Sequence, residues 1–600
     1  MTNAQKLSAF LTPAVAERAG VIDRAGGSGP ECPGRDLLIS GLEYDSRKVQ
    51  DGSCYFALPG LHADGRAFIP EAVKRGAAAV VYEGERGSFP AGPVYIRVKD
   101  ARFAMSPIAD AYYGSPSRRL GVIGVTGTEG KSTTVYLIWQ LLRLLKKKAG
   151  FISTVQYSLG SGAEWNSEHQ TTPEAVTVQR LLAEMRDHGA EYAVIESSSH
   201  GLSPRTNRLG DVAYDAAVMT NVTHEHLEFH GTWEQYRDDK ANLFRALGRF
   251  SHTKTIGRPG AETAPVEVPA FGVINADDPS AVFFAEAARA DAAPETDGFP
   301  VFTYSVRGKA AGLSLQSIES FAERNRYRVL DADSNTALEI ADRLPGAFNA
   351  GNVLAALLTV SRILALPLPE PAALVPLLKP VRGRMTAVNR GQAFEALVDY
   401  AHTPSSFSAI FPPLRERLEK QGGRIISLFG SAGERDTAKR SEQGRIAWKW
   451  SDIVILTDED PRGEEPMAIL EEIARGIDGN GTDRPSEHEG PRAKIVRRGE
   501  NLFLIPDRPE AIRRAFSLAA PGDLVLLLGK GHENSIIYAG ETRPYDEITE
   551  AEKALEELTA NQPQTEGWRG ITPALSNKDN VEGPIVSATS LPQSTKIRDI

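Results

Sequence analysis

A glycine-rich segment between a predicted strand and a predicted helix constrains the fold of this chain more than any other feature. The segment consists of Gly127, Thr128, Glu129, Gly130, Lys131, Ser132 and Thr133. It follows the apolar residues 120–125, and residues 135–145 carry apolar side chains at helical spacing. In such a strand–loop–helix, backbone N–H groups and a lysine bind phosphate oxygens, and the serine hydroxyl can bind Mg²⁺. The segment therefore predicts a nucleotide-phosphate site, although Val125 stands where the general pattern G-x-x-x-x-G-K-[ST] has its first glycine.

Length and turn-rich segments divide the chain into modules. At about 150 residues per domain, the 600 residues suggest about four domains. Glycine and proline interrupt regular structure at 113–117, and 379–384 is a basic, turn-rich segment. We therefore predict modules at 1–117, 118–383 and 384–559, and a disordered tail at 560–600, where Ser, Thr, Pro, Gln and Asn are abundant. Predicted strands at 192–196, 216–220, 425–429, 453–457 and 524–528 alternate with helical patterns, which indicates parallel α/β sheets.

Charge and cysteine content exclude several classes of protein. The chain has 68 basic and 78 acidic residues, and this net charge of −10 disfavours nucleic-acid binding. Cys32 and Cys54 fit neither a disulfide framework nor a metal-ligand spacing. The N-terminus lacks a signal-peptide pattern, and prolines and charges interrupt the longest apolar stretch, 353–378, so we expect no membrane anchor. We expect a cytoplasmic protein that acts as a monomer.

The glycine-rich segment and six later motifs resemble those of the ATP-dependent Mur ligases. The later motifs are E-S-S-S-H-G-L from Glu196, T-N-V-T-H-E-H-L-E-F-H from Thr220, G-A-F-N-A-G-N ending at Asn352, G-R-M from Gly383, D-Y-A-H-T-P from Asp399 and G-K-G-H-E from Gly529. Glu225 and Glu228 stand where the family has aspartate. The resemblance covers about residues 40–555 and is to the E-type, tripeptide-forming branch. It implies a three-domain α/β architecture with a central P-loop-type ATPase sheet and a C-terminal doubly wound domain.

The resemblance implies an ATP-dependent reaction through an acyl phosphate. Phosphorylation of one anion by another needs concentrated positive charge, which Mg²⁺, Lys131 and helix N-termini would provide. The implied catalytic residues are Lys131, Lys240, His226 and Glu196. The implied metal ligands are Ser132, Glu196, His226 and Lys240, the last as the carbamate that the family carries on this lysine. Without the family, Lys240 reads as a solvated helix lysine. The resemblance favours His226 over His230 as the ligand, and we expect His230 to be a packing residue or to support the metal ligands from behind.

The same resemblance assigns two sets of substrate contacts. Asn349, Asn352, Arg384, Asp399 and His402 would contact adenine and ribose, although Asn349 and Asn352 alone would read as helix caps. Ser46, Thr171, Thr172, Ser198, Thr206 and Arg208 would contact UDP-N-acetylmuramoyl-L-alanyl-D-glutamate, with Ser46 in the UDP-binding module. Arg205 competes with Arg208, because residues 203–208 are two residues longer than the family pattern.

A charged loop in the last module bears on the amino acid that would be added. The implied amino-acid contacts are Arg435, Glu459, Asp460, Pro461, Arg462, Gly529 and Glu533. The family members that use meso-diaminopimelate have D-N-P-R where this chain has E-D-P-R, and the retained Arg462 suits the second carboxylate of that amino acid. The acidic neighbours of Arg462 would instead favour the cationic tail of lysine or ornithine. We expect a diamino acid, with meso-diaminopimelate favoured.

Three other functions fit parts of the sequence. A folylpolyglutamate synthetase shares the glycine-rich segment, but the D-S-R motif at 45–47, which marks the UDP-binding module of the Mur ligases, and the E-D-P-R loop argue against it. A non-catalytic nucleotide-binding relative would have lost residues such as Glu196 or Lys240, which this chain retains. A P-loop kinase or motor would need a glycine in place of Val125, and such proteins lack a match to the later motifs. The ligase interpretation therefore accounts for more of the chain than any of these.

Overall fold

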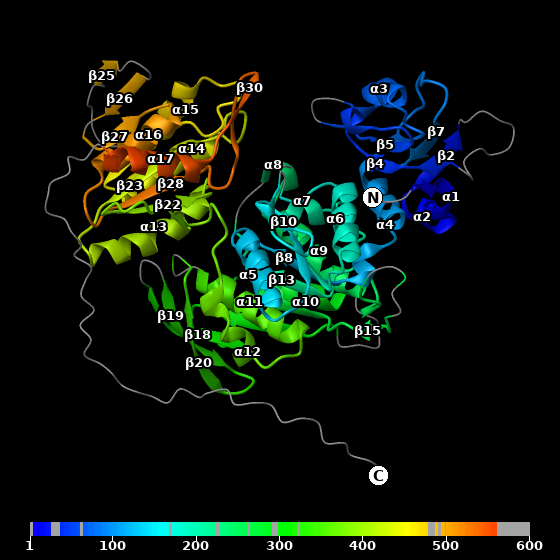
Figure 1. Cartoon of the computed structure of the whole chain (residues 1–600), viewed down its shortest axis with the longest axis horizontal. Helices are drawn as coiled ribbons and strands as arrows, with labels where there is room; N and C mark the ends of the chain where they lie inside the picture. Colours follow the sequence, from blue (N-terminus) through cyan, green and yellow to red (C-terminus); the bar gives the residue numbers. More distant parts are fainter. Residues whose placement is uncertain are drawn as a thin grey trace, which may run out of the picture.

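The structure is a computed structural model of the chain. It describes residues 4–25, 37–60, 64–166, 171–223, 227–257, 260, 263–290, 298–320, 324–344, 346, 349–477, 486–489, 494–498 and 500–560. The predicted tail, apart from Ala560, lies outside these residues. Figure 1 shows three lobes, with the blue N-terminal lobe and the yellow-to-red C-terminal lobe on opposite sides of a central one. The described helices include none that could cross a membrane.

The N-terminal lobe is built on a five-stranded sheet in the order β2-β7-β6-β5-β4. Its strands are β2 (Val21–Ala25), β4 (Gly41–Glu43), β5 (Ser53–Ala57), β6 (Ala79–Glu83) and β7 (Val94–Val98). Only β2 runs antiparallel to its neighbour. The short β1 (Gln5–Lys6) pairs with β3 (Leu38–Ile39). The helices are α1 (Leu7–Phe10), α2 (Pro13–Arg18), α3 (Ile69–Lys74) and α4 (Ala101–Tyr112).

The central lobe has an eleven-stranded sheet in the order β11-β10-β9-β12-β8-β13-β16-β17-β18-β19-β20. The strands from β9 to β18 in this order are parallel, and antiparallel hairpins extend both ends. They are β8 (Gly121–Thr126), β9 (Ala149–Ile152), β10 (Gln156–Ser158), β11 (Glu164–Trp165), β12 (Tyr192–Glu196), β13 (Ala216–Met219), β16 (Phe271–Asn275), β17 (Val301–Ser305), β18 (Leu313–Ser320), β19 (Asn325–Asp331) and β20 (Thr336–Asp342). The separate β14 (Thr253–Lys254) pairs with β15 (Val266–Glu267).

Helices cover both faces of the central sheet, which explains why its inner strands are apolar throughout rather than alternating. They are α5 (Lys131–Leu144), α6 (Ala175–Asp187), α7 (Ser199–Leu202), α8 (Leu227–His230), α9 (Trp233–Arg245), α10 (Ala281–Ala290), α11 (Asn349–Ile363) and α12 (Pro369–Ala372). β8 is buried along its whole length and leads directly into the glycine-rich segment and α5. The predicted strand–loop–helix is therefore confirmed.

The C-terminal lobe has an eight-stranded sheet in the order β21-β22-β28-β23-β24-β27-β26-β25. Its strands are β21 (Thr386–Ala387), β22 (Glu395–Asp399), β23 (Ile425–Phe429), β24 (Ile453–Leu456), β25 (Ser486–Glu489), β26 (Lys494–Arg498), β27 (Leu502–Leu504) and β28 (Leu524–Leu528). The five strands from β22 to β27 in this order are parallel. The helices are α13 (Pro404–Glu419), α14 (Ala438–Trp450), α15 (Pro466–Arg475), α16 (Arg508–Leu518) and α17 (Glu547–Ala560), and β29 (Ser535–Tyr538) with β30 (Glu541–Pro544) forms a separate hairpin.

The five strands predicted from apolar segments are all present. Those at 192–196, 425–429 and 524–528 have the expected bounds, and the other two end one residue earlier, at Met219 and Leu456. These short runs are rich in residues that favour buried strands and are bounded by polar or turn residues, so local pattern was sufficient to locate them.

The segment joining the central and C-terminal lobes is fixed at both ends. The side-chain amide of Gln140 donates to the Lys379 carbonyl over 2.9 Å and accepts from the Lys379 N–H over 3.0 Å. Gly383, at φ +75°, lies so close to the loop at 531–532 that a Cβ there would be 2.4 Å from the His532 nitrogen. Arg382, between these anchors, pairs with Asp546 at 2.9 Å.

Candidate active site

The glycine-rich segment closes tightly around the carboxyl end of β8. Gly127 has φ +149°, and a Cβ there would lie 1.9 Å from Thr220 Oγ1; Gly130 has φ +82°, and a Cβ there would lie 2.4 Å from Asn352 Oδ1. Only glycine fits at either position. Lys131 is the first residue of α5, and its Nζ donates to the Thr128 carbonyl over 2.8 Å. The loop thus presents backbone N–H groups, a helix N-terminus and a lysine at one point, the arrangement that binds phosphate.

A carboxylate and a hydroxyl meet beside this loop. Glu196 ends β12, which pairs with β8 so that Glu196 lies opposite Val125. Its side chain is buried, with 2% of the residue exposed, and Oε1 accepts a 3.0 Å hydrogen bond from the Ser132 hydroxyl. Oε2 accepts from the Thr154 N–H over 2.8 Å. Hard oxygen donors of this kind are the ligands that Mg²⁺ prefers, so the pair fits the predicted metal.

Of the other two predicted metal ligands, the structure describes Lys240 but not His226. Lys240 lies on α9 with 1% of its surface exposed, and Nζ donates to the Gly127 carbonyl over 2.5 Å, so α9 brings it to the glycine-rich loop. His226 lies outside the described residues. Within the described part of the chain, no three His, Cys, Asp or Glu side chains cluster as a ready metal site. His230 is buried, and its ring nitrogens lie 2.7 Å from Asp239 Oδ2 and 3.1 Å from Ser199 Oγ.

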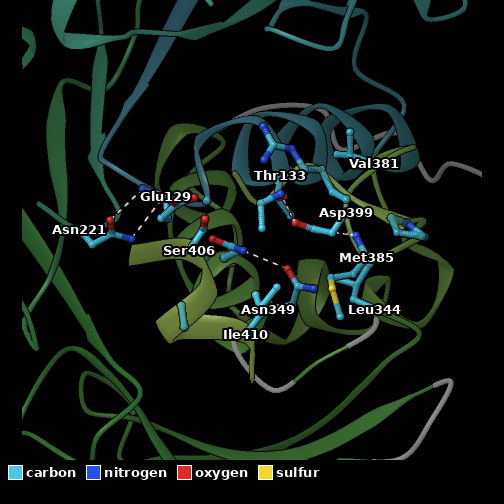
Figure 2. A pocket seen from close by; sticks show the side chains of 16 residues that line it. Glu129, Thr133, Asn221, Leu344, Asn349, Val381, Met385, Asp399, Ser406 and Ile410 are labelled. Atoms are coloured by element: carbon cyan, nitrogen blue, oxygen red, sulfur yellow. Dashed lines mark hydrogen bonds between the residues drawn. The ribbon is translucent and has the colours of Figure 1, made fainter. Parts of the chain in front are cut away.

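A cavity of about 200 Å³ lies between the glycine-rich loop, α11 and the C-terminal lobe. It is lined by Glu129, Gly130, Thr133, Asn221, Leu344, Asn349, Asn352, Pro380, Val381, Arg384, Met385, Asp399, Ala401, Ser406, Ala409 and Ile410. Figure 2 shows apolar side chains such as Ile410, Leu344 and Met385 next to polar ones such as Asn349 and Asp399. An apolar space with a few polar groups beside a phosphate loop suits a nucleoside base.

Most of the residues predicted to contact the nucleoside line this cavity. Asn352 Nδ2 donates to Asn349 Oδ1 over 3.0 Å, which holds both amides in one orientation (Figure 2). Asp399 accepts from the backbone N–H groups of Met385 and Ala401, both at 2.7 Å, and burial raises its pKa, an effect that the nearby Arg384 opposes. His402 does not line the cavity: its Nδ1 lies 2.8 Å from the Tyr400 carbonyl. The predicted nucleoside role of His402 therefore receives no support from the geometry.

A second group of predicted contacts gathers at the start of α7. Thr172 and Ser198 lie with their hydroxyls 2.8 Å apart, and Arg208 donates to the Thr172 carbonyl over 2.8 Å. Arg205 turns away and donates to the Phe229 carbonyl over 2.6 Å. The structure thus brings Arg208, rather than Arg205, to the loop that holds Thr171 and Thr172.

Two members of the predicted muramoyl-peptide set remain. Thr206 donates to the His200 carbonyl, which keeps it beside α7. Ser46 is buried in the N-terminal lobe at the start of a short 3₁₀ turn, which Asp45 caps by accepting from the Arg47 N–H. Arg102 of that lobe binds Glu174 at 2.8 Å, and Glu174 also binds Arg208. Glu174, which the sequence did not single out, therefore links the N-terminal lobe to this group.

The predicted amino-acid contacts lie along one edge of the C-terminal sheet. The Gly433 N–H donates to the Asp460 carbonyl over 2.8 Å, so the segment carrying the exposed Arg435 lies against the loop of Glu459, Asp460, Pro461 and Arg462. Gly529, at φ +101°, leaves room for Glu459, whose Oε2 would be 3.3 Å from a Cβ at 529. Asp460 Oδ1 binds the buried Lys530 at 2.9 Å, and Lys530 also binds Glu533 at 2.5 Å.

Hairpin β29–β30 fixes the conformation of this loop. The Ile537 N–H donates to Asp460 Oδ1 over 3.0 Å, and the Arg462 N–H donates to the Ile537 carbonyl over 2.8 Å. Arg462 takes the left-handed φ of +55°, so its side-chain direction is imposed by these contacts. Tyr538 donates to Asp458, and burial raises the pKa of Asp458 to about 7.

Several functional contacts come from residues that sequence reasoning did not single out. Asn221 Oδ1 accepts from the Glu129 N–H over 2.9 Å and its Nδ2 donates to the Glu129 carbonyl over 3.1 Å, so it holds the phosphate loop from the end of β13 (Figure 2). Lys530 pairs with both Asp460 and Glu533. Both residues lie inside motifs that carry the family resemblance, so the sequence marked them as candidates. Their partners are distant in sequence, and only the fold shows which residues they contact.

Comparison with known proteins covers all three lobes. The family models described as "Mur ligase family, catalytic domain", "Mur ligase middle domain" and "Mur ligase, glutamate ligase domain" match residues 38–113, 125–360 and 383–531. The UDP-N-acetylmuramyl-tripeptide synthetase of Treponema denticola is 50% identical over 537 residues, which cover 87% of this chain and 95% of that protein.

Two further similarities concern proteins with a more specific name. The UDP-N-acetylmuramoyl-L-alanyl-D-glutamate–2,6-diaminopimelate ligase of Geobacillus kaustophilus is 37% identical over 522 residues, covering 86% of this chain and 95% of that protein. A solved structure of a ligase with the same name has a TM-score of 0.55 at 26% identity, and the match covers 88% of this chain and 97% of that one.

Proposed function

This chain belongs to the Mur ligase family and is an ATP-dependent ligase, and from that premise we propose that it joins meso-2,6-diaminopimelate to UDP-N-acetylmuramoyl-L-alanyl-D-glutamate. The proposal assigns the uridine diphosphate to residues 1–117, ATP to 118–383 and the amino acid to 384–559. The names of the tripeptide synthetase and diaminopimelate ligase relatives support the reaction class.

The choice of diaminopimelate rests on one observation in the loop that follows β24. Among the described residues Arg462 has no ion-pair partner, since the carboxylate of Asp460 pairs with Lys530 instead. The buried Nε of Arg462 donates no hydrogen bond. In the same loop, Glu459 is buried and its Oε2 accepts no hydrogen bond. Arg462 and Glu459 thus each have a buried polar atom without a hydrogen bond, and such an atom costs free energy. A ligand whose far end carries both an anionic and a cationic group would give each of them a partner. The far end of diaminopimelate carries an ammonium and a carboxylate.

The proposal assigns the binding of ATP, metal and muramoyl peptide to different residues of the chain. The N–H groups of the glycine-rich loop and Lys131 would bind the phosphates of ATP, and the cavity near Asn349 would hold its base. Ser132 and Glu196 would hold Mg²⁺, and Lys240, as a carbamate, would serve the same purpose. The metal would supply positive charge against the phosphate oxygens. Thr172, Ser198 and Arg208 would orient the peptide carboxylate so that the γ-phosphate can be transferred to it.

L-Lysine or L-ornithine is the second candidate for the added amino acid. Glu459 alone could bind the cationic tail of either, which would leave Arg462 without a partner. The diamino acid can be identified by measuring phosphate release and tripeptide formation from ATP and UDP-N-acetylmuramoyl-L-alanyl-D-glutamate, with each of the three amino acids in a separate reaction. We expect turnover with diaminopimelate. Turnover with lysine or ornithine alone would reverse the amino-acid assignment, and no turnover with any would contradict the proposed reaction.

Replacing Arg462 by alanine should raise the KM for diaminopimelate by about 10²-fold, because a charge-assisted pair with the second carboxylate is lost. The KM for ATP should change less than about twofold, since Arg462 lies outside the nucleotide cavity. Steady-state kinetics with each substrate varied in turn would measure both. Arg445→Ala, an exposed arginine on α14, is the matched control and should leave both values unchanged. Equal rises in the two KM values for Arg462→Ala would contradict the role.

A further inference from the structure

A second cavity, of about 180 Å³, lies where the central and C-terminal lobes face each other. The central lobe contributes Thr154, Trp165 and Asn166, and the C-terminal lobe contributes Tyr400, His532, Glu533, Asn534 and Asp546. Most of these residues carry polar groups, and the rings of Trp165, Tyr400 and His532 add apolar surface to the lining. Since both lobes contribute walls, this cavity exists only while they are apposed.

The position of the cavity relates it to two parts of the candidate active site. On one side, the Thr154 N–H donates to Glu196 Oε2, and the other oxygen of Glu196 accepts from Ser132 beside the phosphate loop. On the opposite side, Glu533 binds Lys530, which binds Asp460 of the amino-acid loop. The cavity therefore spans the space between the predicted site of phosphoryl transfer and the predicted site of the amino acid.

Trp165 lines this cavity and is also partly exposed to solvent. It ends β11, one of the two edge strands of the central sheet, and 46% of its surface is exposed. The guanidinium of Arg382 lies 5.5 Å from the ring centroid, and Arg382 pairs with Asp546, which lines the same cavity. A large apolar ring that both lines the cavity and reaches solvent, with a cation from the interlobe segment against its face, is well placed to limit the entry of water.

We propose that Trp165 is a positioning residue that excludes water from the cavity in which the proposed reaction would bring the amino group and the activated carboxylate together. The proposal rests on the proposed function. In the productive step the amine nitrogen bonds to the acyl carbon, the bond from that carbon to the phosphate oxygen breaks, and hydrogen phosphate leaves with the proton of the amine. Water can attack the same carbon, giving back the carboxylate and dihydrogen phosphate. Excluding water therefore couples ATP consumption to amide formation.

The test compares the ratio of phosphate released to tripeptide formed in the full-length enzyme and its variants. The wild type should release one phosphate per tripeptide, and Trp165→Ala should raise this ratio about threefold or more, because water reaches the acyl phosphate. The KM for the amino acid should rise while the KM for ATP stays within about twofold of the wild-type value. Trp165→Phe should restore most of the coupling. Trp448→Ala is the matched control, since Trp448 is 41% exposed on α14 and does not line the cavity.

The outcomes separate this proposal from the proposed function. If the wild type forms no tripeptide, the proposed function is wrong. If the wild type forms tripeptide and Trp165→Ala keeps a ratio of one with an unchanged amino-acid KM, the role of Trp165 is wrong. Thermal unfolding would show whether Trp165→Ala is folded. If it is not, Trp165→Leu takes its place and should give a ratio above that of Trp165→Phe, and a ratio of one would again contradict the role.

Discussion

Replacing Lys131 by methionine should lower kcat/KM for ATP by about 10³-fold, because the positive charge at the N-terminus of α5 is lost where negative charge develops on the transferred phosphoryl group. Lys131 is the first residue of α5 and directly follows Gly130, so its charge stands at the point where the loop and the helix N-terminus meet. The fold should survive, since methionine is a good helix former of similar length.

Phosphate release at saturating dipeptide and amino acid, with ATP varied, would measure this effect. Lys148→Met is the control, because Lys148 is exposed beyond the end of the same helix. A variant that retained more than about a tenth of the wild-type kcat/KM would show that the loop does not bind the reacting phosphates through Lys131.

Lys240→Ala should abolish activity to a similar extent, about 10³-fold, while leaving the protein folded. Lys240 is buried beside the glycine-rich loop, where its Nζ donates to the Gly127 carbonyl, so a carbamate on this side chain would place an anion next to Ser132 and the phosphates. Loss of a carbamate would remove an anionic metal ligand, and a small carboxylate such as formate could occupy the vacated space. Formate should therefore restore part of the activity of Lys240→Ala.

The rescue experiment has an internal control. Formate should not restore the activity of Lys131→Met, because that variant lacks a cation rather than an anion. Full activity of Lys240→Ala without formate would rule out the proposed role of Lys240 as a metal ligand. If the variant is folded and inactive and formate does not restore its activity, the role of Lys240 would be limited to its hydrogen bond with the Gly127 carbonyl.

Local pattern in the sequence was enough to predict β8, the glycine-rich loop and α5, because a buried strand, a glycine loop and an amphipathic helix each depend on neighbouring residues. Long-range contacts were not predictable in this way. Because residues 203–208 are two residues longer than the family pattern, the sequence could not decide whether Arg205 or Arg208 reaches the Thr172 loop. The structure shows Arg208 bonded to the Thr172 carbonyl and Arg205 to the Phe229 carbonyl. Lys530 illustrates the same limit, since it reaches Asp460 across 70 residues of sequence.

The nucleoside role of His402 stays a prediction. His402 lies in the same D-Y-A-H-T-P segment as Asp399, but unlike Asp399 it is not among the residues that line the nucleotide cavity. Its ring lies against Tyr400, 4.6 Å between centroids, and the next residue, Thr403, caps α13 in a capping box with Ser406. The motif alone contains no information about these contacts.

The fixed ends of the interlobe segment leave Pro380, Val381 and Arg382 as the residues whose backbone angles can change between them, and the ring of Pro380 restricts its own φ. Pro380 and Val381 line the nucleotide cavity, and the Arg382 guanidinium lies over the ring of Trp165, which lines the second cavity. A rotation of the lobes about this segment would change both cavities together. On the proposed assignment of ATP to the first cavity and the amino acid to the second, such a rotation would couple the two ligands, and each would change the dissociation constant of the other by the same factor.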